Sequence, residues 1–261
     1  MRIHSLLSTA GALSAALVLI VGASAREGQA QSLAARVRQA GDGTVRFSFA
    51  AREGVCGNGR NNISVRSERN QDVESECETG PVMVALTKAD GQVTSLRTYV
   101  GARWKAGGAD VTQLGTVGAR DAVDYLLGVA ESGSGKIAEQ AIFPATLADS
   151  VTPWPRLLKL ARDEERPSAV RRQAVFWVGQ AASEEATKGL ADVVDDASGD
   201  REVREAAVFA LSQQRANGVE SLLRIARENK DKEIRKRAIF WLGQSKDPRA
   251  LDFFESVLVK R

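Results

Sequence analysis

Four phenylalanines recur at a nearly constant spacing in the second half of the chain, and this periodicity limits the possible folds more than any other feature. They stand 33, 33 and 31 residues apart, each within a similar apolar segment, at Phe143, Phe176, Phe209 and Phe240. A fixed period in this range indicates a solenoid, in which each unit buries its apolar face against its neighbours instead of around one central core. Solenoids of this kind bind other molecules more often than they catalyse reactions.

A second set of positions has the same period. The second helix expected in each unit carries apolar residues at i, i+3 and i+4. These sets begin at Leu190, Leu222 and Phe254, which lie 32 and 32 residues apart. The total of 64 residues equals the distance from Phe176 to Phe240. Because two independent positions in the unit agree, we expect repeated pairs of helices.

The pattern within each unit indicates the type of repeat. Residues 231–243 read Asp-x-x-Ile-Arg-x-x-Ala-Ile-x-x-Leu-Gly, and earlier units carry parts of the same pattern. This pattern resembles bacterial HEAT-like repeats of the phycobilisome-lyase type, over about residues 119–261. The resemblance implies an α-α solenoid in this part of the chain. The stretch from Asp121 to Glu131 is expected to form a half-repeat that caps the array.

The resemblance also assigns a structural role to two Asp and Arg pairs. The family's Asp and Arg fall on Asp200 and Arg204 in one unit and on Asp231 and Arg235 in the next. Each pair is one helical turn apart, where we expect it to cap the helix and to pair along the array. The first unit is irregular, because Pro144 falls where the interior of a helix is expected.

The segment before the repeats has the pattern of β-strands. Residues 45–49 alternate apolar and polar side chains, which is typical of a half-buried strand. Residues 82–87 and 93–100 flank an Asp-Gly turn and predict a hairpin, and a further short strand is expected at 63–66. We therefore expect a β-rich module over residues 44–100 and an α+β protein as a whole. The next 18 residues, 101–118, contain five glycines and are expected to be a connector.

Both cysteines of the chain, Cys56 and Cys77, fall within this module. A disulfide between them is the default expectation in an oxidising compartment. Closing a loop of this size stabilises a small domain by about 3 kcal/mol on the chain-entropy model. The alternative is a reactive thiol pair, although the spacing is unlike the Cys-x-x-Cys of redox centres.

Residues 1–25 have the features of a secretory signal peptide: a basic start, an apolar stretch and the small residues Ala23-Ser24-Ala25. We expect cleavage after Ala25, with Ala30 as a second candidate, followed by an N-terminal segment over residues 26–43. A retained membrane anchor is the alternative, but the apolar run is shorter than the ~20 residues that a spanning helix needs. The mature chain is therefore expected to be periplasmic or secreted from a bacterial cell, without stable membrane insertion.

Charge and histidine content argue against several classes of function. Residues 1–25 contain one Arg and no acidic residue, so the formal charge of +3 becomes +2 in the mature chain, too small to indicate nucleic acid as a partner. His4 is the single histidine and leaves with the signal peptide. This excludes Ser-His-Asp and Cys-His catalysis and His-ligated metals. We expect no cofactor, no metal site and no catalytic residue.

The aromatic series is the candidate binding site. We call the six residues the aromatic ladder: Phe143, Phe176, Trp177, Phe209, Phe240 and Trp241. If exposed, the ladder would form an apolar patch of the kind that anchors protein partners. The alternative, which the sequence favours, is packing between the two helix layers or against the connector. Four basic residues were candidates for a rim around it: Arg172, Lys236, Arg237 and Arg249.

Taken together, these features predict a non-catalytic adaptor or scaffold of the bacterial cell envelope that binds a protein through a face of the solenoid. The sequence identifies neither the partner nor the oligomeric state. A second hypothesis is an envelope sensor or ligand-binding protein that uses the β-rich module. A third is an enzyme that works with Asp, Glu, Lys or Tyr in place of histidine.

Overall fold

The structure is a computed structural model that describes residues 31–59, 62–65, 77–181, 183–214 and 216–258. By its internal contacts the chain divides into Met1–Gln31 and Ser32–Arg261, and everything below concerns the second of these units. The predicted signal peptide lies outside the described residues.

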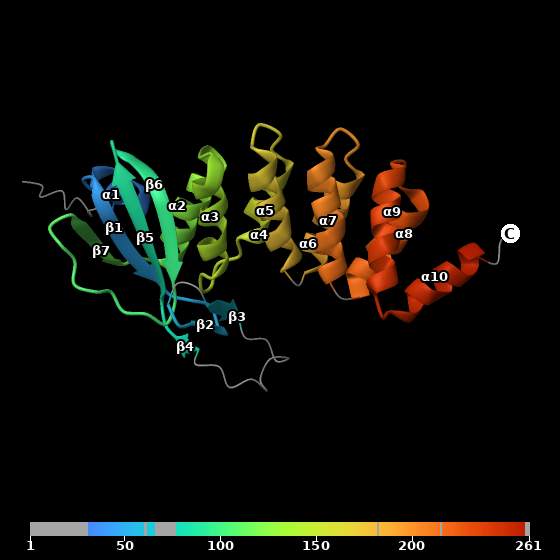
Figure 1. Cartoon of the computed structure of the whole chain (residues 1–261), viewed down its shortest axis with the longest axis horizontal. Coiled ribbons are helices and arrows are strands. Elements are labelled where there is room, and N and C mark those ends of the chain that lie inside the picture. The colour runs from blue at the N-terminus through green and yellow to red at the C-terminus, as the bar shows by residue number, and fades with distance from the viewer. Residues whose placement is uncertain (1–30, 60–61, 66–76, 182, 215, 259–261) are drawn as a thin grey trace, which may run out of the picture. The chain divides into compact units, whose positions relative to one another are not determined.

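A four-stranded sheet forms the N-terminal part of the described chain (Figure 1). Its strands lie in the order β6-β5-β1-β7, and β6 pairs with β5 and β5 with β1 in antiparallel fashion. The predicted hairpin between β5 and β6 is confirmed, and its turn residues Asp90 and Gly91 both have positive φ, as a two-residue hairpin turn requires. The strand bounds are β1 (Gly43–Phe49), β5 (Val82–Ala89), β6 (Gln92–Tyr99) and β7 (Val111–Thr116).

A second, three-stranded sheet carries the disulfide. Its order is β3-β2-β4, with β2 (Val55–Gly57) between β3 (Ile63–Val65) and β4 (Glu78–Thr79). The predicted disulfide is confirmed: Cys56 in β2 is bonded to Cys77, with the two Cα atoms 5.3 Å apart. The bond joins the central strand to the start of the edge strand, where the sheet itself contributes few hydrogen bonds.

Two elements lie where the sequence analysis expects none. Helix α1 (Leu33–Gln39) lies within the N-terminal segment 26–43, and strand β7 lies within the expected connector 101–118. Both depend on distant parts of the chain. Strand β7 pairs in parallel with β1, which lies more than 60 residues away in sequence. Helix α1 has only 7 residues and is too short to be stable without contacts to other elements. The connector is therefore corrected to a loop followed by an edge strand.

Helix α1 is held at both ends by side chains from other elements. The backbone N–H of Leu33 donates to both carboxylate oxygens of Asp121, at 3.1 and 2.9 Å. At the other end Lys88 of β5 is 96% buried and its Nζ donates to the carbonyls of Val37, Arg38 and Ala40. An anion at the N-terminus and a cation at the C-terminus both complement the helix dipole. These contacts stabilise a helix that is too short to form alone.

Nine helices follow the sheet in the described part of the chain, in two layers (Figure 1). One layer consists of α3, α5, α7 and α9, each in contact with the next, and the other of α2, α4, α6, α8 and α10. This arrangement confirms the predicted solenoid of helix pairs and the α+β class. The helix bounds are α2 (Ala119–Ser132), α3 (Gly135–Thr146), α4 (Trp154–Arg162), α5 (Ser168–Gly179), α6 (Glu184–Asp195), α7 (Arg201–Gln213), α8 (Ala216–Glu228), α9 (Lys232–Gln244) and α10 (Pro248–Leu258).

The sheet and the first helices share one hydrophobic core. Val45, Phe47 and Phe49 point from β1 to the helical side, and the ring of Phe47 meets Tyr125 of α2 edge-on with ring centres 6.1 Å apart. Burial among these groups raises the pKa of Tyr125 to about 12. Helix α2 thus packs against the sheet through Tyr125 at the N-terminal end of the helix array. The β-rich region and the helices therefore share one continuous core.

We expect Lys88→Met to destabilise the fold by about 1–3 kcal/mol, because three carbonyls of α1 lose their buried donor. Urea unfolding followed by circular dichroism measures the effect. Lys159→Met on the exposed side of α4 is the matched control and should change stability by less than about 0.5 kcal/mol. Equal losses in the two variants would show that the helix contact contributes nothing specific.

Candidate functional site

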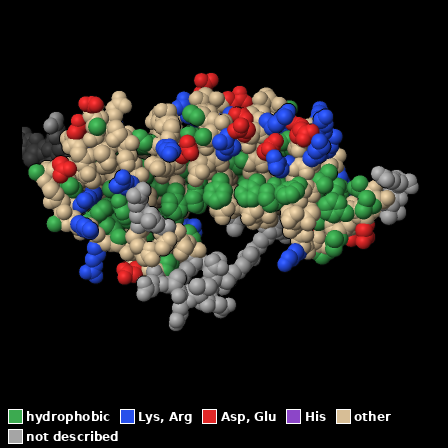
Figure 2. Space-filling model, viewed as in Figure 1, with side chains coloured by type: hydrophobic (Ala, Val, Ile, Leu, Met, Phe, Trp, Pro, Cys, Tyr) green, Lys and Arg blue, Asp and Glu red, His purple; other side chains and the backbone are tan. Residues whose placement is uncertain are grey.

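The aromatic ladder lies at the surface of the layer formed by α3, α5, α7 and α9. Phe176 is 38% exposed and Phe240 is 52% exposed, whereas Phe143 and Phe209 are half-buried. Figure 2 shows a continuous band of hydrophobic side chains across the helices on this face. The phenylalanines occupy the solvent-facing side of their layer and are not enclosed between the two helix layers. The packing that the sequence favoured is therefore wrong for Phe176 and Phe240.

The ladder consists of two similar clusters, one from each half of the array. In the N-terminal aromatic cluster Trp177 stacks on Phe143 of the preceding helix and meets Phe176 edge-on, each with ring centres 5.1 Å apart. The C-terminal aromatic cluster repeats this with Trp241 between Phe209 and Phe240, each with ring centres 5.0 Å apart. Each tryptophan thus joins two neighbouring helices and holds an exposed phenylalanine in a defined position.

Close packing between α5 and α7 explains why the tryptophans do not occur in every repeat. Ala210 of α7 stands where Trp177 and Trp241 stand in α5 and α9. A Cβ atom placed on Gly179 would lie 2.8 Å from the Cβ of Ala210, so the two helices are in direct contact there. A larger side chain at Ala210 would meet the backbone of α5. The clusters are consequently two repeats apart.

The four basic residues predicted to form a rim around the ladder each bind an acidic side chain. Arg172 of α5 binds Glu202 of α7, and Arg237 of α9 binds Glu205 of α7 at 2.7 Å. The other two proposed members of a basic rim are also paired, Lys236 with Glu233 at 3.0 Å and Arg249 with Asp247 at 2.8 Å. The proposed basic rim is therefore neutralised by the protein itself. A partner on this face meets apolar side chains bordered by closed ion pairs.

The two repeat aspartates begin helices. Asp200 accepts a hydrogen bond from the backbone N–H of Glu202 at 3.0 Å, at the start of α7. Asp231 accepts one from the N–H of Glu233 at 2.9 Å, at the start of α9. The hydrogen bond from Glu233, followed by that from the backbone of Ile234 and the positive charge of Arg204, lowers the pKa of the Asp231 carboxyl below its usual value. Both residues are N-caps, so their role is to stabilise the starts of the helices.

One arginine in each of three repeats forms hydrogen bonds with the C-terminal end of the preceding helix. Each donates to carbonyls at or just beyond the C-terminus of the helix before it: Arg171 to Ala161 at 3.0 Å, Arg204 to Val194 at 2.9 Å, and Arg235 to Asn229 at 2.6 Å and Lys230 at 3.1 Å. Arg204 also binds Asp231 of the next repeat at 3.1 Å. Arg171 and Arg204 are buried. Arg204 thus joins α7 to the end of α6 and to Asp231 at the start of α9.

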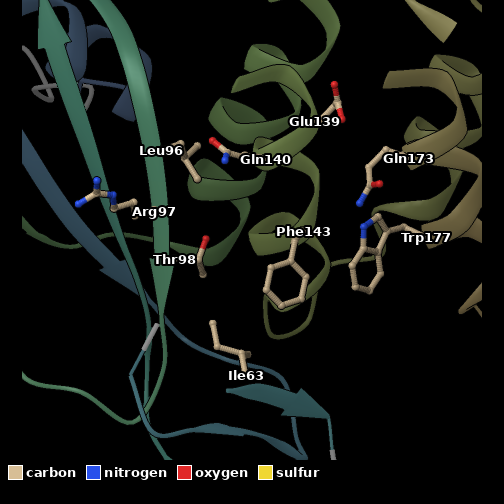
Figure 3. A pocket seen from close by; sticks show the side chains of 9 residues that line it. All are labelled: Ile63, Leu96, Arg97, Thr98, Glu139, Gln140, Phe143, Gln173 and Trp177. Atoms are coloured by element: carbon tan, nitrogen blue, oxygen red, sulfur yellow. The ribbon is translucent and has the colours of Figure 1, made fainter. Parts of the chain in front are cut away.

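A cleft beside β6, which we call the β6 cleft, lies next to the N-terminal aromatic cluster (Figure 3). Its volume is about 520 Å³. The β-strands contribute Ile63, Leu96 and Thr98, and the helices α3 and α5 contribute Gln140, Phe143, Gln173 and Trp177. Sequence reasoning identified Phe143 and Trp177 but not the cleft, because it forms between segments that are distant in sequence.

Within the residues that the structure describes, no group of three or more His, Cys, Asp and Glu side chains is placed to hold a metal ion. None of the described helices has the length and hydrophobicity needed to cross a lipid bilayer.

Comparison with known proteins supports the assignment of the repeats. Residues 234–260 match the PBS lyase HEAT-like repeat family, over a range that contains most of α9 and all of α10. This match confirms the resemblance for the last helix pair, and the preceding helices stack in the same two layers. A search for similar curated proteins found no match. Residues 234–260 thus contain a HEAT-like repeat, and repeats of this kind mediate protein interactions.

We expect Arg204→Met to destabilise the array by roughly 2–4 kcal/mol, because the carbonyl of Val194 and the carboxylate of Asp231 lose a buried donor together. Arg237→Met is the control, since its ion pair with Glu205 is exposed and should contribute less than about 1 kcal/mol. Urea unfolding of both variants makes the comparison. A loss at Arg204 no larger than that at Arg237 would contradict the assigned role.

The lowered pKa of Asp231 predicts a specific dependence on pH. Because the folded state holds this pKa below the usual 3.8, the charged carboxylate stabilises the fold above about pH 3.8 and loses this effect as pH falls through the folded pKa. Asp231→Asn should therefore be less stable than wild type at pH 7, with the difference shrinking toward pH 2. Thermal melts across this range measure it, and a difference independent of pH would contradict the prediction.

Proposed function

We propose that this chain is a non-catalytic adaptor of the bacterial cell envelope, which binds a protein partner through one face of its HEAT-like helix array. The observation that carries this proposal is the aromatic ladder at the surface of α3, α5, α7 and α9. Surface patches of contiguous apolar side chains are typical of protein-binding sites, and aromatic residues dominate the energetics of such sites.

The arrangement of the ladder suits docking of a partner. Phe176 and Phe240 extend into solvent, and each is packed edge-on against a tryptophan that limits its movement. Because these side chains are already ordered, this chain loses little further side-chain entropy when a partner binds them. The flanking ion pairs supply a polar border around the apolar contact.

Export of the chain is part of the proposal. The disulfide between Cys56 and Cys77 is typical of proteins in oxidising compartments, such as the bacterial periplasm. The features of residues 1–25 point in the same direction. Catalysis is not part of it, because the mature chain would contain no histidine and the ladder offers aromatic rings in place of acid–base groups.

A ligand-binding function of the β-rich region is the second candidate. The observation that favours it is a cluster on the outer face of the large sheet, where the guanidinium of Arg46 lies 4.9 Å from the ring centre of Trp104. Tyr99 meets the same Trp104 edge-on, with ring centres 5.8 Å apart. Half-buried aromatic rings beside a cation form a surface suited to flat or polar ligands. Stabilisation by a ligand that Trp104→Ala abolishes would favour this function.

The adaptor function predicts that Phe176→Ser/Phe240→Ser loses its partner while remaining folded. Affinity capture of envelope proteins on the mature chain identifies candidate partners, and each candidate is then purified and its Kd measured. The double variant should weaken binding at least tenfold, because both anchors of the ladder are removed. Its thermal midpoint should stay within a few degrees of wild type, since both side chains are partly exposed.

Leu251→Ser is the matched control. Leu251 is 64% exposed on α10, outside the ladder, and its replacement should leave partner binding unchanged. Equal binding by the double variant and wild type would contradict docking on the ladder. Unfolding of the double variant would show that the phenylalanines serve the core instead.

A further inference from the structure

Strand β6 has a free edge that faces the β6 cleft. In the sheet order β6-β5-β1-β7, β6 pairs with β5 on one side only. Val100, just beyond its end, pairs on the other side with Gly59: its N–H donates to the carbonyl of Gly59 at 3.2 Å and its carbonyl accepts from the N–H of Gly59 at 2.8 Å. An extended segment of the chain itself therefore already uses this edge.

The alternation of backbone groups identifies which other residues face the same edge. In a strand, the N–H and C=O of every second residue point to the same side. Thr98 and Leu96 thus present their N–H and C=O groups on the side that Val100 uses. Both residues line the β6 cleft, and in the described part of the chain no strand pairs with them there. The edge offers two backbone donors and two backbone acceptors at strand spacing.

Apart from Arg97 and Glu139 at its border, the side chains that line the cleft are uncharged. Figure 3 shows the amide of Gln140 pointing from α3 toward Leu96, and the ring of Phe143 beside the indole of Trp177. The two charged residues at the border, Arg97 and Glu139, point away from Phe143. The cleft therefore combines amide groups and an aromatic wall with the open backbone edge. An uncharged peptide segment complements this cleft. Its backbone can form hydrogen bonds with the strand edge and with side-chain amides, and an apolar side chain can pack on the aromatic rings.

We propose that the β6 cleft binds an extended, uncharged segment of a partner protein, which pairs as an added strand with Leu96 and Thr98 and places an apolar side chain against Phe143 and Trp177. This inference rests on the proposed adaptor function and specifies how the partner is recognised. Phe143 and Trp177 belong to both the cleft and the ladder. A segment bound at β6 therefore continues directly onto the face that carries Phe176.

A proline at Thr98 tests the strand pairing directly. Thr98→Pro removes the N–H that faces the cleft and leaves the hydrogen bonds to β5 in place, because prolines are tolerated on edge strands whose N–H points outward. Thr98→Val keeps the backbone donor and is the matched control. The probe is a displayed library of random linear dodecapeptides, selected on the mature wild-type chain and then synthesised for measurement of Kd.

We expect the selected peptides to be uncharged over four to six residues with one apolar anchor. Thr98→Pro should weaken their binding about tenfold or more, and Thr98→Val less than threefold. Amide hydrogen exchange on the wild type should show protection of Leu96 and Thr98 when the peptide is added. This second readout applies even if Thr98→Pro proves to be misfolded in a thermal melt.

Three outcomes would overturn the inference. They are a charged or helical consensus among the peptides, unchanged exchange at Leu96 and Thr98, and equal binding by folded Thr98→Pro. Displacement of the peptide by a neutral oligosaccharide that itself protects these amides would assign the cleft to a glycan. If Phe176→Ser/Phe240→Ser loses the natural partner while folded Thr98→Pro retains it, the adaptor function stands and the added strand is wrong.

Discussion

The contact between the inner face of the large sheet and helices α2 and α3 is the one on which the other features depend. A row of repeats leaves an apolar surface uncovered at each end, and such ends must be closed for the protein to remain soluble. Here the sheet covers the N-terminal end, with Phe47 and Phe49 in the same core as Ile142 of α3. The same contact positions β6 beside α3 and α5. The β6 cleft thus results from how the array is closed.

Features with a local cause could be predicted from the sequence. The helix pairs repeat with a fixed period, the hairpin has an Asp-Gly turn, and the two cysteines are the single possible disulfide. The strand β7 and helix α1 could not be predicted, because β7 pairs with β1 and α1 depends on Lys88 and Asp121. Their stability comes from residues about 50 to 90 positions away in sequence, and no window of the sequence shows it.

In the candidate site, too, local features could be predicted from the sequence, whereas features that depend on tertiary contacts could not. The phenylalanine period predicted which residues align, but not their exposure or their grouping. Grouping depends on Ala210, whose contact with Gly179 leaves no room for a tryptophan at this position of α7. The repeat arginines were expected to pair along the array, and Arg204 does so with Asp231. Their hydrogen bonds to the carbonyls of the preceding helix could not be predicted, because these depend on the geometry of the loop between the two helices.

The bridge between Val100 and Gly59 has a consequence for how long a bound segment can be. At one end the bridge to Gly59 occupies the edge just beyond β6. At the other end the register with β5 shifts next to Lys88, which interrupts the regular alternation. The usable edge is therefore about five residues, or roughly 16 Å at 3.3 Å per residue. So few backbone hydrogen bonds favour rapid release of the bound segment. A long-lived complex therefore requires a second contact further along the helices.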